Sequence, residues 1–167
     1  MIRSIADFEQ LWTNEAVGTQ KLFDELTDAS LAQEGAPGFR TLGRIAWHLV
    51  TTVPEVLERT GLEVTGVRVD SMPPVSAAEI ADAWRAVQAS ALAEVRARWV
   101  DETLEEMDDM YGERWTRGTT LTVLVLHQAH HRGQMTVLMR QAGLSVPGVY
   151  GQSRDEWAQW GAQPPVV

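Results

Sequence analysis

Residues 119–143 of this chain read TTLTVLVLHQAHHRGQMTVLMRQAG, and they contain both the clearest helical pattern and three of the four histidines. Apolar residues recur here at three- and four-residue spacing, which is the period of an amphipathic α-helix. The threonines at its start suit a helix N-cap, and Gly143 stands where a C-cap glycine is expected. The stretch therefore predicts a helix over residues 119–142.

Three other segments have the same helical period, and they cover about residues 4–31, 41–60 and 76–99. The third opens with Ser76-Ala77-Ala78-Glu79, which reads as a capping box in which a hydroxyl and a carboxylate satisfy backbone amides reciprocally. Pro54 lies inside the second segment, where we expect it to kink or divide the helix because proline lacks a backbone N–H.

A long connector, an acidic loop and a tail complete the chain. The connector, residues 61–75, is longer than a tight antiparallel turn needs, so it could leave the second and third helices parallel. We expect residues 101–118 to form a loop with a short ribbon around 111–115, and the tail, 144–167, to hold a helical turn or two. Four amphipathic segments with almost no strand signal predict an all-α four-helix bundle that occupies residues 1–167 as one domain.

The composition excludes several classes of function. The 167 residues are 44% hydrophobic and 22% charged, as in a globular domain. The net charge of −9 argues against nucleic acid or an anionic membrane as a partner, since both are negatively charged. Without a signal-peptide core or an apolar run of ~18 residues, we expect the cytoplasm by default. Cysteine is absent, which excludes disulfides, thiolate ligands and a cysteine nucleophile.

The histidines are the candidate functional residues. On a helix His131 lies about 40° from His127 and one turn further along, so two imidazoles can converge on one cation. Gln134 returns to within about 20° of His127, whereas His130 lies about 60° to the other side. His48, at the edge of the apolar stripe of the second helix, could join them from a neighbouring helix. Histidines four apart also occur without a metal, and His48 taken alone is better explained as a hydrogen-bonded boundary residue.

Three neutral imidazoles from two helices would hold a divalent transition metal such as Zn²⁺ or Ni²⁺ and leave coordination positions open. Such an ion lowers the pKa of a bound water or thiol, which produces a nucleophile at neutral pH. A helical zinc protease would read His-Glu-x-x-His, with the glutamate as general base. Gln128 stands at that position here and cannot accept a proton, so we do not expect a protease of that class.

The order and spacing of these motifs resemble the DinB family, also called the DinB/YfiT-like metalloenzyme superfamily. The resemblance rests on IAWH at 45–48, HQAHHRGQ at 127–134 and LMRQAG at 138–143. Weaker matches, LTDASL at 26–31 and PGVYG at 147–151, extend it over most of the chain.

This resemblance implies a four-helix bundle in up-down-down-up order, in agreement with the long connector. It implies a divalent metal held by His48, His127 and His131, with His130 outside the ligand set, and a homodimer. Characterised relatives include thiol-dependent transferases and isomerases that use bacillithiol or mycothiol. The family takes its name from a DNA-damage-inducible gene.

We therefore expect a metal-dependent S-transferase in which the metal activates a small thiol for transfer to an electrophile. Arg132 and Gln134 are the candidate substrate contacts: Arg132 could hold an anionic group, and Gln134 could orient one. Two alternatives stay open, a metal-dependent hydrolase and a non-catalytic stress-response protein that binds a metal or small ligand. The sequence identifies no proton acceptor, and without cysteine any reacting sulfur must come from the substrate.

Overall fold

The structure, a computed structural model, describes residues 2–166, so the first and last residues of the expected domain lie outside it. Its four long helices are α1 (Ile5–Asp24), α2 (Leu42–Glu58), α3 (Ala77–Arg98) and α4 (Arg117–Gln141). Three short 3₁₀ helices and one hairpin accompany them: η1 (Asp28–Ala32), η2 (Asp101–Glu105), η3 (Arg154–Trp160), β1 (Met107–Met110) and β2 (Glu113–Thr116). The expected mainly helical class is confirmed. None of the described helices is long and apolar enough to cross a membrane.

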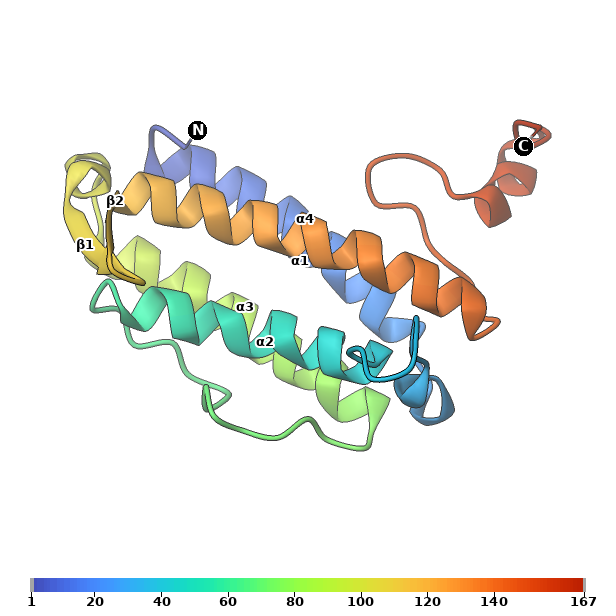
Figure 1. Cartoon of the computed structure of the whole chain (residues 1–167). Coiled ribbons are helices and arrows are strands. Elements are labelled where there is room, and N and C mark those ends of the chain that lie inside the picture. The colour runs from blue at the N-terminus through green and yellow to red at the C-terminus, as the bar shows by residue number, and fades with distance from the viewer. Residues whose placement is uncertain (1, 167) are drawn as a thin grey trace.

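The four long helices pack against one another around a common core (Figure 1). α1 packs mainly against α3 and α4, and α2 packs mainly against the same two helices. Figure 1 shows α1 and α4 running in one direction while α2 and α3 run in the other. The connector of residues 59–76 follows the outside of the molecule from the end of α2 to the start of α3.

Side-chain caps fix where the helices begin. The hydroxyls of Ser4, Thr41 and Ser76 each accept the backbone N–H three residues ahead, as at other helix N-termini. α4 begins earlier than expected, because the N-cap is Thr116 rather than one of the two threonines at 119 and 120. α2 continues through Pro54 without division. Buried residues on both sides of the proline hold the helix together.

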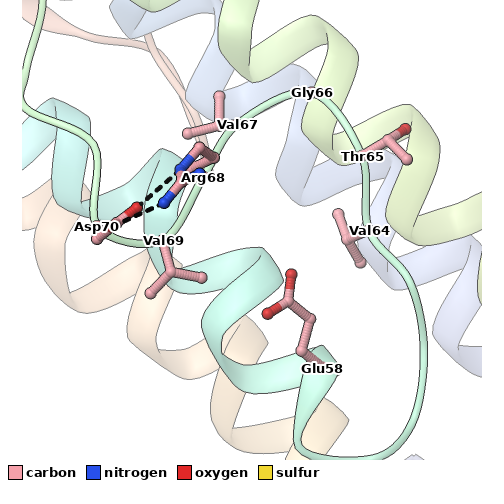
Figure 2. Close-up of a pocket in the computed structure, with 8 residues that line it drawn as sticks. All are labelled: Glu58, Val64, Thr65, Gly66, Val67, Arg68, Val69 and Asp70. Atoms are coloured by element: carbon pink, nitrogen blue, oxygen red, sulfur yellow. Dashed lines mark hydrogen bonds and ion pairs between the residues drawn. The ribbon is translucent and has the colours of Figure 1, made fainter.

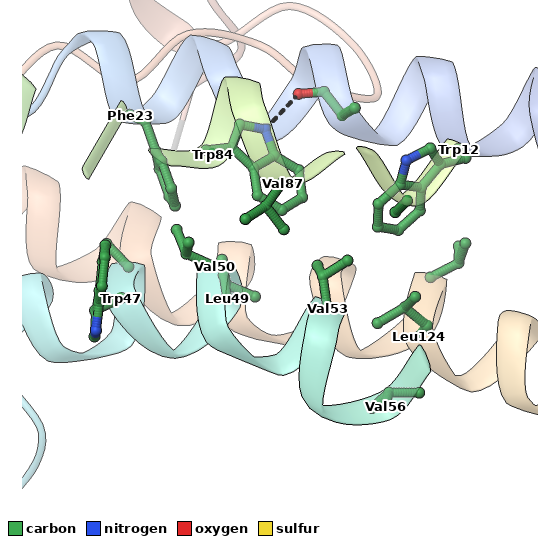
Figure 3. Packing of buried hydrophobic residues seen from close by; sticks show 14 of the residues in the cluster. Trp12, Phe23, Trp47, Leu49, Val50, Val53, Val56, Trp84, Val87 and Leu124 are labelled. Carbon is green, nitrogen blue, oxygen red and sulfur yellow. Dashed lines mark hydrogen bonds between the residues drawn. The ribbon is translucent and has the colours of Figure 1, made fainter. Parts of the chain in front are cut away.

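The core is aromatic between α1 and α3, whereas α2 and α4 contribute mainly aliphatic residues beside Trp47 of α2 (Figure 3). The Trp12 and Trp84 rings lie 6.0 Å apart, and the Trp84 indole donates to the carbonyl of Ala16. Both tryptophans are fully buried, as are Leu49 and Leu124, which face them from α2 and α4. This packing holds α2 beside α4, the two helices that carry all four histidines.

A cavity of about 580 Å³ lies between the connector and the end of α2, lined by Glu58 and residues 64–70 (Figure 2). Two of its three charged residues, Arg68 and Asp70, pair with each other through hydrogen bonds of 3.1 and 3.0 Å. Both side chains are strongly exposed, and no histidine lines the cavity. We assign it no ligand chemistry.

Candidate metal centre

The three histidines expected to be ligands lie together between α2 and α4. The Nε2 atom of His127 lies 3.2 Å from that of His48 and 3.1 Å from that of His131. The candidate ligand atoms of all three residues lie within 4.8 Å of one another. Zn–N bonds of about 2.0–2.1 Å at tetrahedral angles would separate two ligand nitrogens by about 3.3 Å. The cluster could therefore hold a metal ion.

Neighbouring side chains set the orientation of two of these rings. The Thr52 hydroxyl donates to the His48 carbonyl at 2.7 Å, so its oxygen, 3.3 Å from His48 Nδ1, is left to accept the ring N–H. His131 Nδ1 lies 2.7 Å from the Gln134 carbonyl oxygen, which can only accept. Both rings therefore carry their proton on Nδ1, and each turns a lone pair on Nε2 toward His127.

His127 cannot satisfy both of those lone pairs. Its Nε2 could donate to only one neighbour, so one of the two lone pairs stays unpaired. Its Nδ1 is buried without a partner whether or not an ion is bound at Nε2. Buried polar groups are nearly always paired, so this arrangement leaves a clear deficit. A cation bound among the three Nε2 atoms would accept all three lone pairs. The residues present fit a metal ion.

The surroundings also keep the imidazoles in the neutral form that binds metals. Burial lowers the pKa of His48 to about 4, assisted by the positive charge of Arg40. Burial and the neighbouring histidines lower the pKa of His127 to about 4 as well. Burial is also the main cause of the lowered pKa of His131. Because neutral imidazole is the ligand form, no proton has to be displaced at neutral pH.

Cavities open on two sides of the histidines. The larger, about 590 Å³, is lined by His131 and Gln134 together with Arg40 and apolar residues that include Phe39 and Leu138. The smaller, about 260 Å³, is lined by His48, His127, Thr52, Glu55, Tyr111 and Trp115, with aliphatic residues around them. The charged side chain in the larger cavity is the cation Arg40, and the one in the smaller cavity is the carboxylate Glu55.

The two expected substrate contacts have different surroundings. Gln134 lies beside the histidines, accepts from His131, and lies within hydrogen-bonding distance of His130 through its amide nitrogen, 3.1 Å away. Arg132 is buried against α1, where it pairs with Glu15 and donates to the Thr19 hydroxyl at 3.0 Å. Adjacent helix residues point about 100° apart, which separates Arg132 from its neighbour His131. The structure therefore brings Gln134, and not Arg132, to the centre.

Four residues of the site were not identified from the sequence. Thr52 and Glu55 stand four and seven residues after His48, so helical spacing could have placed them on the same face. Arg40 precedes α2, and Tyr111 lies at the turn of the hairpin. No spacing rule links these two loop residues to the histidines, since only the tertiary fold brings them there.

Comparisons with known proteins show relatives of this chain in sequence and in fold. The sequence profile of the DinB family matches residues 1–163. The uncharacterized protein YrdA of Bacillus subtilis (strain 168) is 42% identical over 165 residues, which cover 99% of each chain. A crystal structure of a DinB-like protein from Bacillus cereus ATCC 10987 matches with a TM-score of 0.86 and 49% identity, over 90% of this chain and all of that one. The fold is also that of the DinB-like protein YjoA from Bacillus subtilis, with a TM-score of 0.69 and 15% identity over 87% of this chain and 97% of that one. On the family profile and the two closer likenesses, this chain belongs to the DinB family.

Proposed function

We propose that His48, His127 and His131 bind one Zn²⁺ or Ni²⁺ ion, and that the protein is a metal-dependent thiol S-transferase. The observation that carries the proposal is the convergence of three Nε2 atoms, two of them held as acceptors by Thr52 and Gln134. Imidazole ligands suit ions of this class. The flanking cavities give small molecules access to the histidines from two sides.

The larger cavity supports a small thiol with an anionic group, such as bacillithiol or mycothiol, as one reactant. The Arg40 guanidinium can pair with a carboxylate there, and Phe39, Ile45 and Leu138 can exclude water from it. When bound, an ion of this kind lowers the pKa of a thiol that coordinates it. Gln134 holds the His131 ring with its lone pair toward the centre.

The overall reaction joins the thiol sulfur to an electrophilic carbon. The bond from that carbon to its leaving group breaks, and the leaving group keeps the electron pair. The proton lost by the thiol leaves with the leaving group or passes to solvent. The chain has no cysteine, so the reacting sulfur must come from the substrate.

Metal analysis tests the site. We expect about one equivalent of zinc or nickel per wild-type chain after loading and dialysis, and none for His131→Ala. His130→Ala is the matched control, because its ring is exposed and lies outside the cluster. Retention of a full equivalent by His131→Ala would overturn the site.

Turnover of a bimane- or nitrobenzene-type electrophile with a panel of thiols tests the reaction. We expect thiol-dependent product from the loaded wild type and from His130→Ala, and none from His131→Ala. Cleavage of ester or amide substrates without a thiol would favour a hydrolase instead. A large loss of thermal stability on metal removal, with no turnover, would indicate a structural ion in a non-catalytic binding protein.

We also propose the up-down-down-up bundle and the homodimer that the resemblance implies. The helix directions and the connector of residues 59–76 support the first. Leu126, Gly133 and Val137, which lie on one exposed stripe of α4 about 40° wide, support the second. Light scattering should give a mass twice the 18.6 kDa of one chain, and Val137→Glu should reduce the mass to that of a single chain. An unchanged mass would contradict this interface.

A further inference from the structure

The smaller cavity combines a wall of the metal centre with side chains that are outside it. His48 and His127 form one wall, and Glu55, Tyr111 and Trp115 lie around the rest. At about 260 Å³, it has room for a molecule of modest size between the histidines and the hairpin. None of the polar groups facing it from the hairpin or from Glu55 is used by the proposed metal ligation.

Glu55 lies on the histidine-bearing face of α2 and lines the cavity together with His48 and Thr52. It follows Thr52 by three residues and His48 by seven, so all three share one face of the helix. The rise of about 10 Å between residues 48 and 55 leaves space for a small molecule between the carboxylate and the imidazole.

The tip of the hairpin holds this carboxylate in place. Tyr111 has a φ of 61° and Gly112 a φ of 86°, as in the two-residue turns of β-hairpins. Such turns favour asparagine or glycine, and another residue there is strained. In this conformation the Tyr111 hydroxyl donates to Glu55 Oε2 at 2.6 Å. A strained turn that delivers a side chain to a cavity wall is the kind of feature that marks a functional site.

Glu55 still has hydrogen-bonding capacity after these contacts. Arg59 donates to Oε1 at 3.1 Å and Tyr111 donates to Oε2, so each oxygen has one partner. A carboxylate offers about four acceptor positions, which leaves about two for a ligand. Trp115 directs its indole N–H to Glu113, so its ring is free to provide an apolar surface.

The charges around the cavity decide what it can admit. The Glu55 carboxylate repels an anion, and a bound divalent metal together with Arg59 would repel a cation. An uncharged molecule avoids both penalties, provided that it brings a donor for Glu55 and an apolar part for Trp115 and the aliphatic wall. The larger cavity has the positive charge of Arg40 in its wall, so it attracts an anion and suits the anionic thiol.

We infer that the smaller cavity binds the electrophilic reactant, and that this reactant is a small uncharged molecule with an apolar group and an N–H or O–H donor accepted by Glu55. Its identity as a reactant rests on the proposed function, whereas its recognition by Glu55 does not. Thiol and electrophile would then reach the histidines from two sides. Glu55 is on this view a specificity residue rather than a metal ligand.

Two isosteric probes test this inference. Benzamide and acetophenone differ by an NH₂ in place of a CH₃, so only benzamide can donate to Glu55. Calorimetric titration of zinc-loaded and metal-free protein should give benzamide at least about a tenfold advantage, as expected for a hydrogen bond to a charged group. The Trp115 indole signal, assigned with Trp115→Phe, should shift on binding.

Variants separate Glu55 from its surroundings. Glu55→Met should abolish the benzamide advantage. Glu58→Met is the control and should retain it, because Glu58 lies one turn further along α2 and lines the separate cavity beside the connector. Tyr111→Phe should reduce the advantage without abolishing it, because the carboxylate keeps its charge but loses the hydroxyl that holds it in place. Equal binding of the two probes to wild type, or an advantage that survives in Glu55→Met, would overturn the inference.

The same measurements separate this inference from the proposed function. A Glu55-dependent benzamide advantage in a protein that binds no metal would remove the proposed function and leave the cavity as a binding site. Normal metal content and thiol-dependent turnover without that advantage would remove the inference alone.

Discussion

The buried ion pair between Arg132 of α4 and Glu15 of α1 should be the polar contact on which stability depends most. The exposed fractions of the two side chains are 3% and 6%, so water does not screen them. Removing one partner of such a pair leaves an uncompensated charge and costs about 3–5 kcal/mol. The backbone carbonyl of Glu15 and the Thr19 hydroxyl would still accept from Arg132 after Glu15→Gln. We therefore expect the lower end, a loss of about 3 kcal/mol in the free energy of unfolding.

Urea unfolding of metal-free protein, in the presence of a chelator, measures this loss without the added stabilisation of a bound ion. With a slope of about 2 kcal/mol/M, the unfolding midpoint should fall by about 1.5 M. Arg132→Met alone should also be strongly destabilising. The double variant Glu15→Gln/Arg132→Met should be at least ~1 kcal/mol more stable than the sum of the single losses predicts. Tyr150→Phe is the control: it removes a hydroxyl that accepts from Arg132 and donates to Glu15 but leaves the ion pair in place, so it should lose only about 1 kcal/mol.

A loss below about 1 kcal/mol for Glu15→Gln, or strict additivity in the double variant, would refute this reasoning. The same variants test the substrate role that the sequence predicts for Arg132. If Arg132→Met folds, keeps its metal and loses only turnover, then Arg132 contacts the substrate after all. If turnover follows the folded fraction, the ion pair with Glu15 is sufficient to explain the residue.

Three further predictions concern the tail, the hairpin and the metal. A Cβ on Gly18 would lie 2.7 Å from Val149 Cγ1, so Gly18→Ala should displace the tail. The melting temperature should fall even though alanine has the higher helix propensity, and the double variant Gly18→Ala/Val149→Ala should recover part of the loss. Burial of the Tyr111 hydroxyl, together with its bond to Glu55, raises the pKa of Tyr111 to about 12. Its folded pKa exceeds the unfolded value of about 10, so it stabilises the fold below pH 10, and that contribution is lost as the pH rises toward 12. Burial raises the pKa of Tyr150 as well, so absorbance at 295 nm should show late ionisation of both tyrosines, of which Tyr111→Phe removes one; a normal midpoint near 10 for Tyr111 would contradict this. Free zinc at about 100 times its dissociation constant should add about 2.7 kcal/mol to the stability of wild type and nothing to that of His131→Ala, which thermal unfolding can measure.

The helices were predictable where apolar periodicity and caps agree. The segments expected at 41–60, 76–99 and 119–142 differ from α2, α3 and α4 by only a few residues at their ends. The segment expected to run to residue 31 ends at Asp24 instead, and η1 follows separately. The cause is local, because Thr27 and Ser30 cap each other and compete with a continuous helix.

The histidine cluster was predictable because helical spacing alone brings His127 and His131 onto one face. His48 could be added because it was the remaining histidine and lay at the edge of an apolar stripe. The partner of Arg132 was not predictable, since spacing gives the direction of a side chain but not the neighbour that covers it. Glu15 lies 117 residues away in the chain, and only the packing of α1 on α4 makes it that neighbour.

The polar residues of α4 divide into two groups, and the difference between the groups identifies the site. Toward α1 and the core, Gln128 bonds to Thr19 and to the Leu49 carbonyl, and Arg132 pairs with Glu15, so that face supplies most of its own partners and leaves only Arg132 Nε unpaired among the described residues. Toward α2, the Nε2 atom of His127 lies beside those of His48 and His131, and one N–H cannot pair with both neighbours. Proteins rarely bury polar atoms without partners, and the exceptions call for a ligand or ion. On the face toward α1 that single nitrogen lacks a partner, whereas toward α2 three imidazoles converge with too few donors, and this convergence is the strongest reason to expect that a metal ion belongs there.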